Sequence, residues 1–285
     1  MNTPLATQDS VETPSGKDAA YENFPVGSWL LPAHLRPHIA VYYNFARAID
    51  DIADNPDTQP DEKIKRLSEF ERAVLGEGDP DPLYATGHRM RDSLNETGTT
   101  PQHCLDLVDA FKQDAVKGRY DDWDDLMHYC IRSAAPVGRY LLDIHGGSVD
   151  GYGPSDALCN ALQVINHLQD CQDDYQTMDR VYLPGDWMAA HGGTVEQLDQ
   201  DKASPGIRKV IDQCLDATDE LMIEARRLPA GLKSKRLAME SAFIVRIADA
   251  LIKRLRNEDP VAGRVQLSKP QFVWCGIRGV GSVLF

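Results

Sequence analysis

Residues 42–54 of this chain read YYNFARAIDDIAD. A helix over this stretch carries most of its polar side chains on one face, namely Tyr43, Arg47, Asp50, Asp51 and Asp54. The other positions are mainly small or apolar, so neighbouring helices should enclose it. Carboxylates crowded on an enclosed helix repel one another and lose hydration, which destabilises the fold unless a cation neutralises them. The stretch therefore predicts a largely buried helix with an acidic face that binds cations.

A second polar stripe occurs at residues 163–174, which read QVINHLQDCQDD. On a helix this stripe consists of Gln163, Asn166, Asp170 and Asp174, and the helix is otherwise mainly apolar. Buried amides and carboxylates are costly unless each finds a partner. Hard oxygen donors on two facing helices suit Mg²⁺, which binds one or two carboxylates together with water or phosphate oxygens. The alternative is that the two stripes are solvent-exposed polar faces.

Helical patterns fill most of the chain, and alternating strand patterns are almost absent. The predicted helices cover residues 37–54, 61–75, 83–95, 101–117, 122–148, 156–176, 205–227, 233–257 and 266–280. Short turns with Pro and Gly separate several of them, and none resembles a flexible linker between domains. We therefore predict a disordered polar lead-in at residues 1–20 and a single all-α domain at residues 21–285.

The overall charge limits the possible partners. The 285 residues include 44 Asp and Glu against 30 Lys and Arg, a formal net charge of −14. This balance argues against a nucleic-acid partner, which needs clustered cations, and anionic lipid should repel the chain on average. The six cysteines form no C-x-x-C pair, and neither a signal peptide nor a bilayer-spanning apolar stretch occurs. These features predict a cytoplasmic protein with reduced thiols.

The last segment, residues 272–285, is unusually apolar for so acidic a chain. Several basic residues precede it: Arg254, Arg256, Arg264 and Lys269. The segment either packs on the core or lies against a membrane surface. The second alternative implies peripheral contact with the inner face of the plasma membrane.

The two stripes and two further motifs resemble the squalene/phytoene synthase family over about residues 21–269. The first stripe matches that family's aromatic–Arg–Asp-Asp-x-x-Asp signature, and the second is similar to its Gln-x-x-Asn-x-x-x-Asp-x-x-x-Asp signature. Tyr129 with the small residues that follow it, and the turn at residues 180–184, are similar to two more family motifs. The resemblance implies an isoprenoid-synthase-type helical bundle around a central cavity.

Residues 22–26 (ENFPV) and 166–170 (NHLQD) resemble the bacterial hydroxysqualene synthase branch, which belongs to hopanoid biosynthesis. Most phytoene and squalene synthases carry Arg at the position of Gln169, where it helps hold diphosphate. Its absence here favours an enzyme that takes one diphosphate, already joined. No nicotinamide-binding glycine motif occurs, which favours water over hydride as the group that captures the carbocation. The resemblance thus implies Mg²⁺-dependent conversion of presqualene diphosphate and water into hydroxysqualene and diphosphate.

The resemblance also implies roles for individual residues. The Mg²⁺ ligands would be Asp50, Asp54, Asn166, Asp170 and Asp174. The four aspartates of that set and Tyr129 would be the catalytic residues, with Asp51 in support. Substrate would contact Phe24, Tyr43, Arg47, Ala134, Gly138, Gln163, Gln169, Arg180 and Arg264.

Several of these residues also have simpler interpretations. Arg47 could form only an intrahelical pair with Asp51, and Arg180 and Arg264 could be surface charges. Tyr129 could be a core tyrosine, and the small residues after it could serve only close helix packing. Five histidines are predicted to be structural or surface residues: His34, His38, His128, His145 and His167.

Two other functions stay open. The chain could condense two prenyl diphosphates head to head into presqualene diphosphate, squalene or phytoene. It could also be a family member without activity that serves as an assembly factor. For an enzyme, the expected partners are a polyisoprenoid diphosphate and the pathway enzymes that supply presqualene diphosphate and reduce hydroxysqualene.

Overall fold

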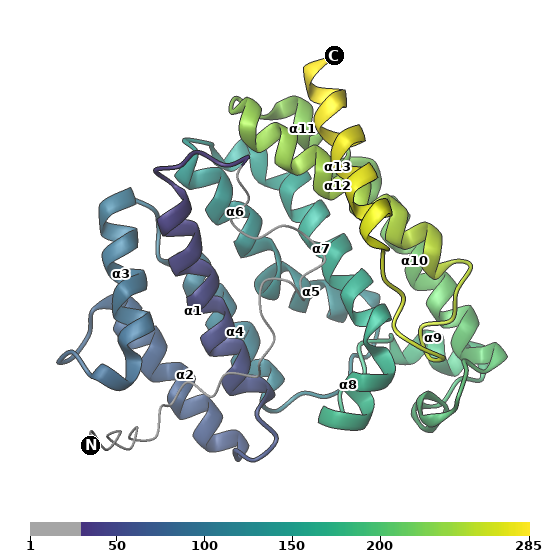
Figure 1. The fold of residues 1–285 in the computed structure, drawn as a ribbon. Helices are drawn as coiled ribbons and strands as arrows, with labels where there is room; N and C mark the ends of the chain where they lie inside the picture. Colours follow the sequence, from purple (N-terminus) through teal and green to yellow (C-terminus); the bar gives the residue numbers. More distant parts are fainter. Residues whose placement is uncertain (1–29) are drawn as a thin grey trace, which may run out of the picture.

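Helices build the whole architecture of residues 30–285, the part of the chain that the computed structural model describes (Figure 1). The α-helices are α1 (Arg36–Asp54), α2 (Pro60–Leu75), α3 (Ala85–Thr97), α4 (Gln102–Asp114), α5 (Trp123–Ser133), α6 (Ala135–Ile144), α7 (Tyr152–Gln169), α8 (Cys171–Met178), α9 (Gly185–His191), α10 (Pro205–Ala225), α11 (Leu228–Gly231), α12 (Lys235–Leu255) and α13 (Lys269–Leu284). Among these residues the only β pairing is an isolated bridge between Arg119 and Val181. The all-α prediction is therefore confirmed, whereas the lead-in predicted at residues 1–20 lies outside the described residues.

Local sequence explains where many helices begin and end. Pro60 begins α2, because its missing N–H and fixed φ suit a first helical turn. The helix stops at Gly76, whose φ of 73° lies in the left-handed region that favours glycine. Ser234 caps α12 by accepting a hydrogen bond from the backbone N–H of Leu237.

The helix predicted at residues 122–148 is two helices. α5 ends at Ser133 and α6 begins at Ala135, with Ala134 at φ −122° and ψ −46° between them. Pro136 explains the break, because a proline has no N–H to continue the hydrogen-bond ladder of α5. Ala134 thus lies at a bend between two helices instead of inside one.

The helix predicted at residues 156–176 is also interrupted, at Asp170, where φ is −106° and ψ is 8°. Backbone hydrogen bonds nevertheless continue across the interruption. The N–H of Asp170 donates to the Asn166 carbonyl at 3.0 Å, and the N–H of Asp174 donates to the Asp170 carbonyl at 2.8 Å. The polar stripe therefore passes from α7 into α8. The short helices α9 and α11 were not among the predicted ones.

Two apolar clusters hold the helices together. One lies among α1 to α4 and contains the fully buried Phe45, Ile49 and Phe70. The other is larger, lies mainly among α5, α7, α10 and α12, and contains Ile165 and Ile211. Figure 1 shows α1 to α4 on one side of the molecule, α10, α12 and α13 on the other, and α5 to α7 between them. α1 and α7 run in the same direction, and both end toward α8.

The C-terminal helix α13 packs one face on α12. Gly279 allows close approach, because a Cβ there would lie 2.6 Å from the backbone nitrogen of Phe243. The other face leaves Val273, Trp274 and Ile277 exposed by 58%, 60% and 59%. The core-packing interpretation of this segment is therefore confirmed, and an apolar face remains outside. No helix within residues 30–285 combines the length and apolarity needed to cross a membrane.

Candidate active site

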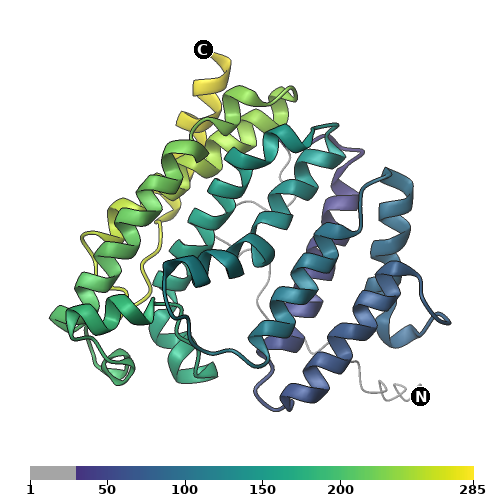
Figure 2. The same cartoon turned by 180° about the vertical axis from the view of Figure 1, so that it is seen from behind.

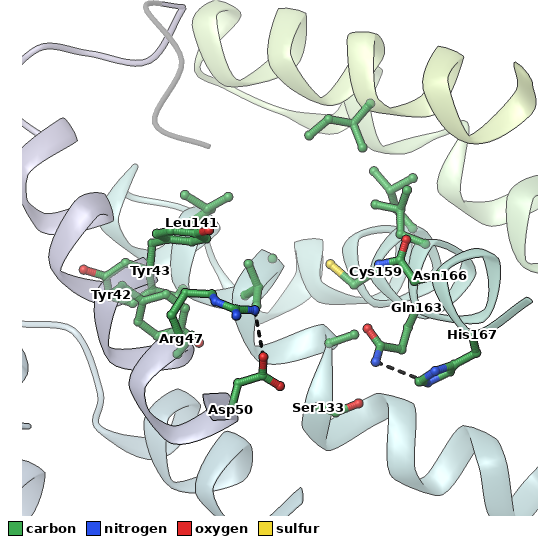
Figure 3. A pocket seen from close by; sticks show the side chains of 18 of the residues that line it. Tyr42, Tyr43, Arg47, Asp50, Ser133, Leu141, Cys159, Gln163, Asn166 and His167 are labelled. Carbon is green, nitrogen blue, oxygen red and sulfur yellow. Dashed lines mark hydrogen bonds and ion pairs between the residues drawn. The ribbon is translucent and has the colours of Figure 1, made fainter. Parts of the chain in front are cut away.

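A cavity lies between α1 and the α7–α8 pair, and the carboxylates of these helices gather at one end. From α1 it is lined, in chain order, by Ile39, Tyr42, Tyr43, Ala46, Arg47, Asp50 and Asp54. From α7 and α8 it is lined by Ser155, Leu158, Cys159, Leu162, Gln163, Asn166, His167, Asp170, Asp174 and Met178. Figure 3 shows side chains of α1 facing those of α7 across the pocket. Since the helices run the same way, both series pass from mainly apolar residues to carboxylates in one direction.

Arg47 lies between the two neighbouring carboxylates of α1. One of its nitrogens donates to Asp50 at 2.7 Å and another donates to Asp51 at 2.9 Å. The intrahelical pair with Asp51 therefore forms, but Arg47 pairs with Asp50 as well. Arg47 and Asp50 line the cavity, whereas Asp51 does not. Arg47 is therefore also placed to meet a ligand in that space.

Arg180 and Arg264 are not surface charges, so that interpretation is wrong. Arg180 is only 6% exposed; it contacts Asp54 at 2.5 Å and donates to the Ala53 carbonyl at 2.8 Å. The Nε of Arg264 lies 2.9 Å from Asp170, and the arginine side chain is 17% exposed. Both arginines line the cavity. Arginine and aspartate side chains are thus paired at the polar end of the cavity.

The donors at this end fit a divalent cation. Asp50 and Asp54 lie in the last two turns of α1, where the helix dipole is negative, and the last turn holds no basic residue. Within residues 30–285, no three His, Cys, Asp or Glu side chains form a group that could enclose a metal ion. Mg²⁺ does not require such a cage, because one or two carboxylates with water and phosphate oxygens complete its shell. The donor set therefore suits Mg²⁺ bound together with a diphosphate.

Tyr129 belongs to a buried hydrogen-bond network. Its hydroxyl donates to Asp114 at 2.6 Å, and the Tyr182 hydroxyl lies 3.5 Å from the other oxygen of the same carboxyl. Burial raises the pKa of Asp114 to about 7, although Arg180 and the hydrogen bond from Tyr129 both act to lower it. Tyr129 is 2% exposed and lines the cavity. It is both a core tyrosine with a satisfied hydroxyl and part of the cavity wall.

His167 lines the cavity, so its prediction as a structural or surface residue is incomplete. Its ring stacks on Tyr182, with centroids 3.5 Å apart and planes 13° apart, and its Nε2 lies 3.2 Å from the amide nitrogen of Gln163. Burial, with a smaller effect of Arg180, lowers the pKa of His167 to about 3. The ring is therefore neutral near pH 7. His167 can both stack on Tyr182 and line the cavity, because Tyr182 is itself part of the cavity wall.

The small residues after Tyr129 serve two purposes. Ala134 and Gly138 line the cavity, whereas Ala135 does not. A Cβ at position 138 would lie 2.3 Å from the Ser155 hydroxyl oxygen and 2.7 Å from the Cys159 sulfur. The close-packing interpretation therefore holds for Gly138, because a larger residue would push α6 away from α7.

One predicted substrate contact lies outside the cavity wall. Gln169 is 2% exposed, is not part of the cavity wall, and donates to the Val265 carbonyl at 2.5 Å. Its side chain therefore braces the segment that carries Arg264, and a direct diphosphate contact is not what the geometry supports. Phe24 lies outside the described residues. Tyr43 and Gln163, by contrast, both line the cavity.

Known proteins are similar to this chain in sequence and in fold. The family described as Squalene/phytoene synthase matches residues 18–271. The chain belongs to that family. A hydroxysqualene synthase of Rhodopseudomonas palustris is 43% identical over 262 residues, 92% of this chain and 89% of that protein. A hydroxysqualene synthase of Zymomonas mobilis is 40% identical over 259 residues, 90% of this chain and 86% of that protein.

The structural comparison agrees with the family assignment. A crystal structure of a squalene synthase from Alicyclobacillus acidocaldarius superposes with a TM-score of 0.71 at 32% identity, covering 81% of this chain and 87% of that one. The expected isoprenoid-synthase-type helical bundle is therefore confirmed.

This squalene/phytoene synthase family member has cavity residues that sequence reasoning missed. Asp114 on α4 and Glu240 on α12 are 7% and 2% exposed, and both line the cavity. The sequence does contain a pattern that indicates both residues, because each carboxylate occupies a position where the helical repeat otherwise places apolar core residues. Asp114 follows the buried Leu107 and Ala110 at such spacing, and a carboxylate at a core position indicates a site.

Proposed function

We propose that this chain is a hydroxysqualene synthase, which converts presqualene diphosphate and water into hydroxysqualene and diphosphate. The observation that carries the proposal is a cavity with the carboxylates of α1, α7 and α8 and three arginines at one end and mainly apolar residues toward the other. Such a cavity suits a substrate with a diphosphate head and long hydrocarbon chains. The hydroxysqualene synthases of Rhodopseudomonas palustris and Zymomonas mobilis, similar over about nine tenths of the chain, support this choice.

The polar end binds the leaving group in this proposal. Mg²⁺ would be held by Asp50, Asp54, Asn166, Asp170 and Asp174. When bound, the metal supplies Lewis-acid stabilisation of the departing diphosphate. Arg47, Arg180 and Arg264 already face this space, and they can exchange a carboxylate partner for diphosphate oxygens. The arginines thus neutralise the carboxylates before binding and the diphosphate after it.

The cavity wall protects the carbocation. The rings of Tyr129, Tyr182 and His167 form a continuous aromatic surface, with Tyr129 and Tyr182 centroids 5.7 Å apart. Aromatic faces attract positive charge, and a neutral His167 adds no repulsion. The Tyr129 hydroxyl donates a hydrogen bond to Asp114. Its oxygen is therefore held by that contact and does not react with the carbocation. Ala134 and Gly138 let hydrocarbon approach the helix backbone.

Head-to-head condensation of two prenyl diphosphates is the second candidate, since other family members are named phytoene synthases. An inactive assembly factor fits less well. Within residues 30–285, the cavity is lined by six Asp and Glu but only three Arg, and a bound cation would offset the remaining negative charge.

The decisive assay supplies presqualene diphosphate and Mg²⁺ without NADPH and identifies the products. We expect hydroxysqualene and diphosphate, and removal of divalent metal by chelation should abolish turnover. Asp174→Asn should lower activity by roughly two orders of magnitude or more. Asp173→Asn, on the exposed neighbouring residue, is the matched control and should stay close to wild type. Absence of any C30 alcohol from this assay, together with consumption of two prenyl diphosphates in a parallel reaction that supplies them, would support the second candidate.

We also propose that α13 places the enzyme against an anionic membrane surface. Residues 226–285 hold 12 Lys and Arg against 4 Asp and Glu, a net +8 within a chain of −14. The same region exposes Trp274 and Ile277 on α13 and ends with the exposed Leu284 and Phe285. An apolar helix face beside basic residues favours the interface of an anionic bilayer. Such contact would keep the enzyme near a poorly water-soluble substrate and product.

A further inference from the structure

A second hollow reaches the surface beside the apolar end of the cavity. It lies between the α6–α7 connection and α11, and it is lined by exposed residues that include Gly147, Asp150 and Lys233. No predicted function uses it. Three of its lining residues, Leu142, Leu228 and Leu237, also line the main cavity.

Within residues 30–285, these three leucines are the residues that line both spaces, and they form the wall between them. They are 4%, 6% and 4% exposed, so little of each side chain is open to solvent. Leu228 lies on α11, which has only four residues and is too short to be stable without its packing. Opening the wall would require a rotamer change of these leucines or a movement of the α11 turn. The wall therefore consists of three leucine side chains, one of them on a four-residue helix that depends on its packing against α12.

The position of this wall is at the far end from the metal-binding residues. Asp50, Asp54 and Asp170 lie where α1 and α7 end, whereas α11 and the α6–α7 connection lie at the opposite end of the molecule in both Figure 1 and Figure 2. The C-terminal part of α13 is at this same end in both views. An apolar exit here would open near the surface that we propose to contact lipid.

We infer that the Leu142–Leu228–Leu237 wall is a gate through which the long hydrocarbon passes between the cavity and the surface. The inference rests on the proposed function only in requiring that the cavity holds a C30 isoprenoid. A C30 hydrocarbon has no group that pairs with the arginines and carboxylates of the polar end, and passage there would separate those ions from their partners. Three leucines offer an apolar route that leaves the ion pairs intact.

The test measures the release rate of labelled squalene, a non-reactive C30 hydrocarbon, from preloaded full-length protein to acceptor vesicles. Leu228→Ala should speed release and Leu228→Trp should slow it, each by roughly tenfold. Leu221→Trp on α10 is the matched control, because Leu221 is a partly buried core residue that lines neither space. It should leave the rate unchanged.

Opposite effects of the two Leu228 variants separate a gate from a structural role, since general destabilisation would shift both rates the same way. Unchanged rates, same-direction shifts, or failure of the wild-type protein to retain squalene would each overturn the inference. None of these results depends on presqualene diphosphate chemistry. Failure of the proposed reaction would instead appear as missing hydroxysqualene in an enzyme that still releases squalene through the gate.

Discussion

Arg180 shows how one buried side chain connects the two acidic segments. Its guanidinium reaches from the turn after α8 to both Asp54 and the Ala53 carbonyl at the end of α1. A planar fork makes these two contacts at once, which a lysine cannot reproduce. The charge at position 180 therefore holds the polar end together before any ligand binds.

Arg180→Lys should lower the free energy of unfolding by about 1–3 kcal/mol, because a buried contact is lost and a partner is left unsatisfied. The KM for a diphosphate substrate should rise as well. Arg119→Lys is the matched control: Arg119 bonds Asp179 at an exposed site, where an ion pair contributes little. Urea denaturation of both variants checks the difference, and equal losses at the two positions would contradict the assigned role.

Asp114 gives the protein a pH dependence with a defined sign. Burial raises the pKa of its carboxyl from 3.8 to about 7 in the folded state. Below about pH 4 both folded and unfolded states hold the proton. As pH rises toward 7 the unfolded state releases it first, so stability falls across this window and levels off above it.

Asp114→Asn removes this titration. Wild type should lose stability relative to the variant between about pH 4 and pH 7, by about 4 kcal/mol at most. Unfolding by urea at several pH values, in metal-free buffer, measures the difference. Parallel stability curves for the two proteins would show that Asp114 is ionised at neutral pH in the folded state.

At the scale of elements, the two helix breaks coincide with the site. Ala134 separates α5 from α6 and lines the cavity, and Asp170 separates α7 from α8 and lines its polar end. The sequence pattern alone predicts helices that continue without a break past both positions. Helix termini expose backbone groups and redirect side chains, so breaks of this kind are places where a cavity can form.

The contact between α6 and α7 should be sensitive to a single methyl group. Gly138→Ala places a Cβ against Ser155 and Cys159 and should destabilise the fold by about 1–3 kcal/mol. Gly153→Ala is the control, because nothing lies within 4 Å of the corresponding Cβ and alanine favours a helix. Thermal unfolding should therefore show a lower Tm for the first variant and an equal or higher Tm for the second.

At the scale of the whole molecule, charge is unevenly distributed along the chain. The net +8 of residues 226–285 implies −22 for residues 1–225. The average acidity therefore does not describe the surface near α12 and α13. An anionic membrane would attract this end of the enzyme and repel the rest, which favours one orientation.

Trp274→Glu should weaken sedimentation with vesicles that contain anionic lipid, because it removes an exposed aromatic ring and adds a repelled charge. Val116→Glu is the matched control, since Val116 is 67% exposed but lies beyond the end of α4. Vesicles of neutral lipid should bind the wild type and both variants less tightly than the wild type binds anionic vesicles. Equal binding of the two variants to anionic vesicles would rule out α13 as the contact.

The sequence alone determined the helical fold, most helix positions and the two polar stripes. It could do so because helical periodicity and the cost of burying carboxylates are local properties of the chain. The Gln163–Asp174 stripe even keeps its alignment across the interruption at Asp170, since backbone hydrogen bonds continue there. Resemblance to the family then related the stripes to Mg²⁺ and diphosphate.

Only the tertiary structure decided which partner each side chain has. Arg180 and Arg264 could not be distinguished from surface charges, because their carboxylate partners are far away in sequence. Gln169 was expected at the substrate, but packing against the segment at Val265 turns it inward. Asp114 likewise belongs to the site only because folding places it beside Tyr129, whose hydroxyl donates a hydrogen bond to it. The net charge of −14 is a sum over the chain, whereas burial, pKa and pairing depend on neighbours that folding alone brings together.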